Sequence, residues 1–324
     1  MKNRELNKEF TSLFKEAEKG MELIGLKLEF KENAIYFKGK EMQGTWQEIW
    51  QKLKKEFKSA RELKRIETYK SKSFQSMVWS NQDERAFKWL DRNMMPEKVS
   101  AVMEVQEQMV ETRLRIQETG RQVESVQCRL CGCQKETVQH WLAGCKILAS
   151  RDYLKRHDDA LKVFAVEWLK QEGLTNESTI WYNESWERGM VIENELRRLR
   201  WDHEWRTRTA TTHRRPDLVL EYVDEKRMVV IDMGCPREEN VCVTEMEKKL
   251  KYQQLCYELR VQYPGWTIHL IPLIVGCLGS VNNLEANISK VLEKRRVKWT
   301  FAEMQRVVVC CSETIVRKIL SGLY

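Results

Sequence analysis

Four side chains that commonly bind metal ions lie in one short segment, "CRLCGCQKETVQHWLAGC". Cys128, Cys131, His140 and Cys145 follow the spacing C-x2-C-x8-H-x4-C. Zinc prefers four thiolate or imidazole ligands in a tetrahedron, and four protein ligands leave no open position. The segment therefore predicts a structural zinc site, with Cys133 as a bystander. The alternative is four unrelated residues in a chain with ten cysteines.

Two aspartates bracket a second candidate segment, "HRRPDLVLEYVDEKRMVVIDMG", residues 213–234. Its two apolar runs around a charged turn predict a β-hairpin. With the turn centred on residues 225 and 226, Asp217 lies opposite Gly234 and on the same face as Asp232. Two carboxylates would repel each other there, so the pattern favours a cation between them. Magnesium binds through one or two carboxylates, waters and a phosphate, and it can polarise a phosphodiester.

A lysine near such an ion could orient a water or stabilise charge on a phosphate. The segment "TEMEKKLKYQQLCYEL", residues 244–259, predicts a helix. On it Lys248, Lys251, Tyr252 and Leu255 share one face by helical spacing. The aspartate pair by itself is a weak signal, because Pro-Asp is a common dipeptide.

Helices and one small hairpin are predicted ahead of these segments. The hairpin joins residues 26–30 to residues 34–38, and helices are expected over residues 3–20, 45–66, 97–120, 146–173 and 190–199. In the helix over 45–66, a stripe of large apolar side chains is typical of a core face. The stripe comprises Trp46, Ile49, Trp50, Leu53 and Phe57.

The fold class expected from these elements is α+β. Three segments are expected: a helical, basic region with one hairpin over residues 1–96; a helix, the zinc module and a following helix over 97–175; and the domain with the aspartates over 176–324. The chain has 324 residues, 42% of them hydrophobic, and 12 tryptophans, a composition that argues against wholesale disorder.

Positive charge is concentrated near the amino end. The net charge is +8, and residues 51–72 hold nine lysines or arginines against three glutamates. A basic run of this kind favours a polyanion such as nucleic acid, although a solvated helix face is the alternative. The candidate phosphate contacts in this run are Lys54, Lys55, Arg61, Lys64 and Arg65.

The sequence predicts neither a secretory signal nor a membrane-spanning segment. It opens with the charged "MKNRELNKEF", and its longest apolar run falls short of the roughly 20 residues that cross a bilayer. An intracellular location keeps thiols reduced. We therefore expect the cysteines to be metal ligands or buried apolar side chains.

The order of the motifs resembles the C-terminal part of site-specific non-LTR (LINE-type) retrotransposon polyproteins. The motifs are "CRLC…ETVQHWLAGC", "YLKRHDDAL", "HRRPDLVL", "VVIDMGCP", "EKKLKY" and "IPLIVGCLGSV", and the likeness covers roughly residues 70–320. In those elements a reverse transcriptase is followed by a CCHC zinc motif and a restriction-like endonuclease.

The resemblance implies a PD-(D/E)XK core, a mixed sheet flanked by helices, with "WTIHLIPLIVG" as a further buried strand. It implies that Asp217 and Asp232 bind magnesium and that Arg215 is the basic residue before the first acid. Lys248 and Lys251, with Tyr252, would match a lysine-tyrosine helix motif. Such a nuclease nicks target DNA in the nucleus and leaves a 3′-hydroxyl primer, with element RNA and a reverse transcriptase as partners.

The chain also departs from that pattern. The usual lysine position, two residues after the second acid, is Gly234, and the one Asp-Asp pair, Asp158 and Asp159, follows the zinc motif, so no polymerase site is present. Residues 1–70 are either the end of the polymerase linker or unrelated sequence. Glu193 is a candidate third carboxylate; the alternative is a surface residue of the helix over 190–199.

Basic side chains near the two acids complete the candidate set. Arg214 and Arg215 are expected to contact DNA, and His157 and His213 are expected to contact phosphate or to have a structural role. Three functions follow as expectations. The chain is a metal-dependent endonuclease, a catalytically inactive nucleic-acid-binding derivative, or an accessory subunit that docks a polymerase through residues 1–60.

Overall fold

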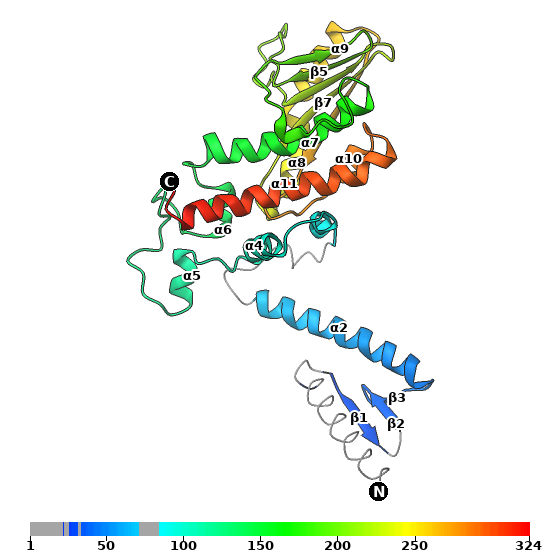
Figure 1. The fold of residues 1–324 in the computed structure, drawn as a ribbon, viewed down its shortest axis with the longest axis vertical. Coiled ribbons are helices and arrows are strands. Elements are labelled where there is room, and N and C mark those ends of the chain that lie inside the picture. The colour runs from blue at the N-terminus through cyan, green and yellow to red at the C-terminus, as the bar shows by residue number, and fades with distance from the viewer. Residues whose placement is uncertain (1–21, 23–25, 32–33, 71–83) are drawn as a thin grey trace. The chain divides into compact units, whose positions relative to one another are not determined.

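The chain forms two compact units. The computed structural model describes residue 22 and residues 26–31, 34–70 and 84–324, and the side chains of residues 61–70 are outside the description. The units comprise Met1–Gln75 and Ser76–Tyr324 (Figure 1). None of the described helices is long and apolar enough to cross a membrane.

The N-terminal unit contains a small antiparallel sheet and one long helix. The strands are β1 (Leu28–Lys31), β2 (Ala34–Phe37) and β3 (Lys40–Glu41), so the expected hairpin is present, and α2 spans Trp46–Lys70. The helix begins with a capping box, in which the Thr45 amide donates to Glu48 Oε2 at 2.8 Å.

The apolar stripe of α2 is only partly a core face. Ile49 and Leu53 are buried against the sheet, whereas Trp50 is 53% exposed. The side chain of Trp46 and the helix expected over residues 3–20 lie outside the described residues.

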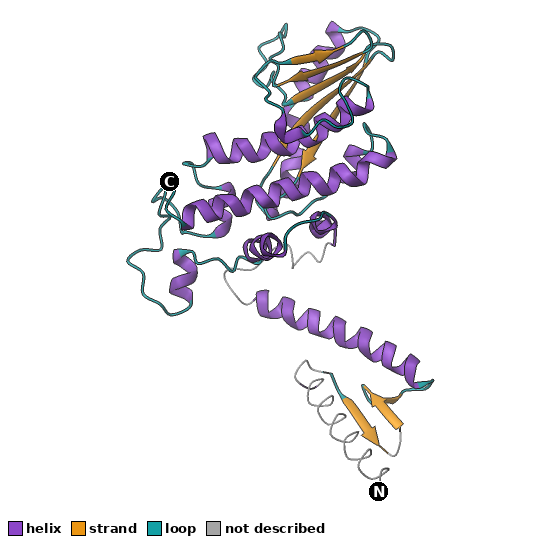
Figure 2. Ribbon diagram, in the orientation of Figure 1, coloured by secondary structure: helices purple, strands orange, loops and turns teal. Residues whose placement is uncertain are grey.

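The C-terminal unit is built on a mixed five-stranded sheet. Its order is β4-β5-β6-β7-β8, with β7 and β8 parallel and every other pair antiparallel. The strands are β4 (Val191–Glu193), β5 (Arg197–Trp201), β6 (Leu218–Tyr222), β7 (Arg227–Gly234) and β8 (Thr267–Ile274). The mixed sheet and its flanking helices confirm the α+β class (Figure 2).

Helices cover both faces of this sheet, which explains its nearly continuous apolar strands. Leu220 and Ile231 pack against α7 (Leu154–Gln171) and α11 (Lys294–Leu320), with the short α10 (Leu284–Ile288) beside them. Val219 and Val230 face the opposite layer. That layer consists of α8 (Val241–Lys251) and α9 (Gln253–Gln262).

The cysteine-rich segment belongs to the same compact unit. It includes α6 (Val138–Ala143) and a π-helical turn, η2 (Ala149–Tyr153), that leads into α7. Trp141 and Leu142 pack against Ile315 and Ile319 of α11, the helix that also covers the sheet. Residues 97–175 and 176–324, expected as separate segments, therefore share one core.

Short elements complete the C-terminal unit. They are the 3-10 turns η1 (Glu84–Asp91), η3 (Trp181–Asn183) and η4 (Glu238–Asn240), and the helices α4 (Pro96–Gln106) and α5 (Arg113–Glu118).

Three helices predicted from the sequence are wrong. Residues 244–259 form parts of α8 and α9, which are separated at Tyr252, rather than one helix. Residues 97–120 form α4 and α5 rather than one helix, because Gln108 is left-handed (φ 53°) and Thr112 caps α5 by accepting from the Arg115 amide at 3.2 Å. Residues 190–199 form the β4–β5 hairpin. The Asn194 side chain accepts from the amides of Leu196 and Arg197 at 2.9 and 2.8 Å, which fixes a turn where a helix was expected.

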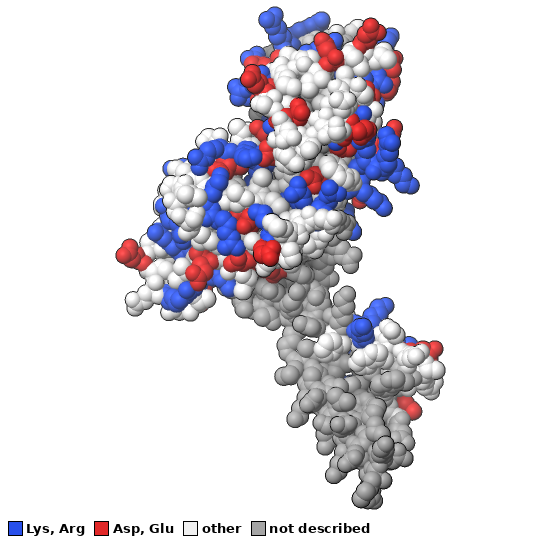
Figure 3. Space-filling view, in the orientation of Figure 1, with Lys and Arg blue, Asp and Glu red and all other residues white. Residues whose placement is uncertain are grey.

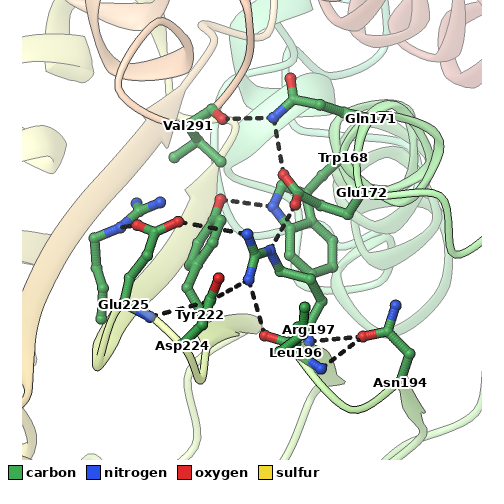
Figure 4. A network of polar contacts seen from close by, with 11 residues as sticks. Trp168, Gln171, Glu172, Asn194, Leu196, Arg197, Tyr222, Asp224, Glu225 and Val291 are labelled. Atoms are coloured by element: carbon green, nitrogen blue, oxygen red, sulfur yellow. Dashed lines mark hydrogen bonds and ion pairs between the residues drawn. The ribbon is translucent and has the colours of Figure 1, made fainter.

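A polar network fixes the turn end of the sheet (Figure 4). Arg197 of β5 donates to Glu172 Oε2 at 2.6 Å and also pairs with Asp224 in the β6–β7 turn. Trp168 Nε1 donates to the Tyr222 hydroxyl at 2.7 Å, which ties α7 to β6. The opposite end of the β6–β7 hairpin carries Asp217 and Asp232.

Candidate functional site

The β6–β7 register brings the two aspartates closer than the sequence predicted. Leu218 pairs with Ile231 through a turn over residues 223–226, so the same register sets Asp217 across from Asp232 and not from Gly234. The sequence placed the centre of the turn at residues 225 and 226, whereas the register places it at residues 224 and 225. Lys226 is left-handed (φ 47°) and ends a four-residue loop that the charged sequence did not reveal. The two aspartates lie on one face, as expected.

Asp232 is a buried carboxylate between two lysines of α8. It is 1% exposed, forms an ion pair with Lys248, and has Lys251 Nζ at 3.8 Å from its Oδ1. That Oδ1 has no hydrogen-bond partner within the described part of the chain. Burial and the nearby Asp217 charge raise the pKa of Asp232, although Lys248 opposes them. A buried carboxylate oxygen that accepts no hydrogen bond and has only the more distant Lys251 ammonium near it fits a site for a cation.

Gly234 gives Lys248 the space to reach Asp232. A Cβ built on Gly234 would lie 2.8 Å from Lys248 Cε and 3.1 Å from Ile274 Cδ1. An amine from α8 therefore lies beside Asp232, over a strand position that has no side chain of its own. Lys251 is farther from the carboxylate, so Lys248 is the lysine that contacts Asp232 more closely.

Asp217 is held by a backbone amide and a histidine. Its Oδ2 accepts from the Met233 amide at 2.7 Å and lies 3.0 Å from His157 Nε2. Burial by itself would raise the pKa of Asp217, but the hydrogen bond and charge of His157, with the charge of Lys248, lower it to about 2. Asp217 is thus ionised across the physiological pH range.

His157 bridges two carboxylates. Its Nδ1 lies 2.9 Å from Asp158 Oδ1 on α7, while its Nε2 faces Asp217. Burial lowers the pKa of this imidazole, but the two carboxylates outweigh burial and raise the pKa well above 6.5. His157 was expected to contact phosphate or to have a structural role, and its contact with Asp217 was missed. The signal that could have found it is the "RHDD" sequence directly after the zinc motif.

Tyr252 and the two arginines lie around this site. Tyr252 is buried and its hydroxyl donates to the Arg215 carbonyl at 3.0 Å; burial and the two aspartates raise its pKa. The Arg215 guanidinium lies 2.8 Å from Asp202, and Arg214 pairs with Glu204 at 2.7 Å. Both arginines are thus paired with acids in this structure. His213 is exposed.

Glu193 does not lie with the two aspartates. It is an exposed residue of the edge strand β4, pairs across the sheet with Arg198 and forms an ion pair with it. Arg198 in turn pairs with Glu221, near the turn end of β6 and four residues from Asp217. The strand register thus separates Glu193 from the site, and its expected place on a helix is wrong.

The four predicted metal ligands converge on one point. The ligand atoms of Cys128, Cys131, His140 and Cys145 all lie within 4.8 Å of one another, and all but Cys131 are buried. Cys131 Sγ lies 3.2 Å from His140 Nε2. This cluster could hold a metal such as zinc. Cys133 is exposed and lies outside the cluster, as expected.

Neighbouring groups orient the cluster. Gln134 Oε1 lies 3.1 Å from His140 Nδ1, which leaves Nε2 facing the thiols, the arrangement typical of metal-binding imidazoles. Tyr153 accepts from the Cys145 amide at 3.0 Å and donates to the Trp141 carbonyl at 2.7 Å. Burial raises the pKa of Cys145 to about 12 in the absence of a metal.

The basic residues of α2 belong to the N-terminal unit. Lys54 and Lys55 are exposed on α2. Arg61, Lys64 and Arg65 lie within the same helix, but their side chains are outside the described residues.

The chain matches no model of a known protein family, and no curated protein matches it at a significant level. The likeness to LINE-type retrotransposon proteins thus rests on the order of its motifs.

Proposed function

We propose that the chain is a metal-dependent DNA endonuclease of the kind found in non-LTR retrotransposons. The observation that carries the proposal is the arrangement of Asp217, Asp232 and Lys248. Two carboxylates lie across from each other at one end of a hairpin, and an amine from the next helix contacts one of them. This arrangement suits phosphodiester hydrolysis, in which negative charge develops on the phosphate and must be stabilised.

Asp217 and Asp232 would hold the magnesium ion. Oδ1 of Asp232, which accepts no hydrogen bond from the described residues, supports this role, because oxygen ligands are what magnesium prefers. The ion would supply a Lewis acid for the phosphate and for the attacking water. Lys248 would hold its ammonium group beside the phosphate oxygens. Lys251, which lies farther from Asp232, would add a second positive charge nearby. His157 would fix the direction of the Asp217 carboxylate.

We further propose that zinc occupies the cysteine cluster and has a structural role. Four protein ligands would complete its shell, so no position would remain for a substrate. The zinc module packs on α11, which also supports the sheet. Loss of zinc would therefore disturb the nuclease core indirectly.

The proposed nicking activity would supply the primer for reverse transcription of a retrotransposon. The nick would leave a 3′-hydroxyl on target DNA in the nucleus, and a reverse transcriptase carrying the element RNA would extend it. The basic residues of α2, Arg214 and Arg215 would contact phosphates, which position a duplex without reading its sequence.

Plasmid nicking tests the proposal. A supercoiled plasmid with magnesium should be converted to the nicked form by the parent protein and not by Asp217→Asn or Asp232→Asn. Glu193→Gln is the matched control, because it neutralises a carboxylate outside the site, and it should nick like the parent. If the plasmid stays intact while a gel shift shows binding, the chain is an inactive nucleic-acid-binding derivative.

A further inference from the structure

A small cavity with basic walls lies between the cysteine cluster and the sheet, within the C-terminal unit. Its volume is 290 Å³, which is the space of about ten waters. Ala143 and Tyr153 line it from the cluster side, and Cys235, Pro236 and Arg237 line it from the segment after β7. Its lining contains no acidic side chain.

Arg156 supplies a buried positive charge to this cavity. The residue lines the cavity, is only 1% exposed, and has no carboxylate within ion-pair distance among the described residues. Its guanidinium donates to the Ser312 hydroxyl at 3.0 Å and to the Leu142 carbonyl at 2.7 Å, both of them neutral acceptors. Among the described residues, its Nε has no hydrogen-bond partner. A buried charge without a counter-ion is costly, so this arginine favours an anion nearby.

Arg237 adds a second, more accessible guanidinium. Its side chain is 32% exposed, and the acid nearest to it, Glu239, is 4.0 Å away. A Cβ on Gly144 would lie 2.7 Å from Arg237 Nη2, so the glycine leaves the space that the arginine occupies. Asn240, which precedes α8, also lines the cavity. The amino end of that helix contributes partial positive charge.

The cavity adjoins the candidate nuclease site through one side chain. His157 lines it and lies 3.0 Å from Asp217 Oδ2. Cys235, which also lines the cavity, directly follows β7, the strand that carries Asp232, and is three residues after that aspartate. An anion in the cavity would therefore lie beside the carboxylates proposed to hold the magnesium ion.

We propose that this cavity binds a backbone phosphate of the DNA strand, adjacent to the one that is cut. The proposal rests on the proposed nuclease function for the identity of its ligand. A lining with two guanidinium groups and no acidic side chain suits a phosphodiester, which accepts charge-assisted hydrogen bonds from arginine. The phosphate held here would set the position of the strand over Asp217 and Asp232.

The test is the affinity of Arg237→Ala for a fluorescently labelled duplex of about 30 base pairs, with calcium in place of magnesium. We expect a loss of about tenfold near 0.1 M salt, the size of one lost charge-assisted contact. The slope of log affinity against log salt should become less steep by about one. Arg237→Lys should keep most of the affinity, because it keeps the charge.

The matched control is Arg295→Ala, which removes a charge that is 71% exposed. Arg295 precedes Ser312 by 17 residues of α11, a rise of about 25 Å. It should change the affinity less than twofold. An equal loss in both variants, or no loss in Arg237→Ala, would overturn the proposal.

A second measurement, thermal melting with inorganic phosphate, tests whether the ligand of the cavity is DNA or free phosphate. It does not depend on cleavage. If inorganic phosphate raises the melting temperature of the parent but Arg237→Ala binds the duplex normally, the cavity binds a small phosphate and the DNA proposal fails. If the parent never nicks a plasmid yet loses duplex affinity on Arg237→Ala, the nuclease proposal fails and the phosphate site stands. Zinc content and circular dichroism of each variant establish that it is folded.

Discussion

Lys248 reaches Asp232 over the α carbon of Gly234. The two side chains form an ion pair, and a methyl group at position 234 would lie 2.8 Å from Lys248 Cε. The absence of a side chain on the strand is therefore what admits the amine from α8.

Gly234→Ala should displace Lys248 from Asp232. We expect plasmid nicking to fall at least tenfold, close to the loss caused by Lys248→Ala. Overpacking of this kind costs about 1–3 kcal/mol of stability, so the variant should remain folded. Nicking rates and urea unfolding measure the two effects separately.

The lysine can be moved back to the strand as a control. In Gly234→Lys combined with Lys248→Ala, the new amine lies on the face of Asp232, two residues away, and it has the space that Lys248 vacates. This double variant should nick faster than Lys248→Ala alone. Equal inactivity of both, with Gly234→Ala fully active, would mean that the amine has no role.

The ion pair between His157 and Asp217 should make stability depend on pH. The raised pKa of His157 means that its contribution is fully present below about pH 6.5 and is lost as pH rises through the raised value. The lowered pKa of Asp217, about 2, means that its contribution is present above about pH 4 and is lost as pH falls toward 2.

The difference in unfolding free energy between the parent and His157→Gln should therefore be largest between about pH 4 and pH 6.5. Urea unfolding across pH 3 to 9 measures it. Imidazole NMR provides an independent readout, because burial lowers the pKa values of His203 and His269, so His157 should stay protonated after both have lost their protons. A difference that does not vary with pH would contradict the ion pair.

Removal of one cysteine of the cluster should release the metal. Purified parent protein should contain one zinc per chain, and Cys145→Ser should contain none and melt at a lower temperature, because binding energies of zinc modules are on the order of 10 kcal/mol. Cys133→Ser is the matched control in the same segment and should keep its zinc, since Cys133 is exposed outside the cluster. Elemental analysis that found zinc in Cys145→Ser but not in Cys133→Ser would assign the ligands differently.

Tyr222→Phe should destabilise the fold without affecting the chemistry. It removes the acceptor 2.7 Å from Trp168 Nε1, and Trp168 is fully buried, so the indole would lose its partner. A buried unpaired donor costs about 1–3 kcal/mol. Tyr182→Phe alters a side chain that is 64% exposed and should change stability by less than about 0.5 kcal/mol. Calorimetry of the two variants makes the comparison.

Local pattern in the sequence was sufficient for several features. The spacing of Cys128, Cys131, His140 and Cys145 predicted which side chains converge, because such a short segment has few ways to fold around one point. The alternation of the β6–β7 hairpin placed Asp217 and Asp232 on one face, since side chains alternate along any strand. Helical spacing likewise put Lys248 and Lys251 on the side of α8 that faces Asp232.

Only the tertiary structure decided the rest. A turn one residue earlier moved the partner of Asp217 from Gly234 to Asp232, and pairing within the sheet made a strand of the segment around Glu193. The contact of His157 with Asp217 joins residues 60 positions apart, and the Arg156 cavity depends on how the cysteine segment packs on the core. Such contacts depend on the packing of whole elements, and no local periodicity in the sequence encodes that packing.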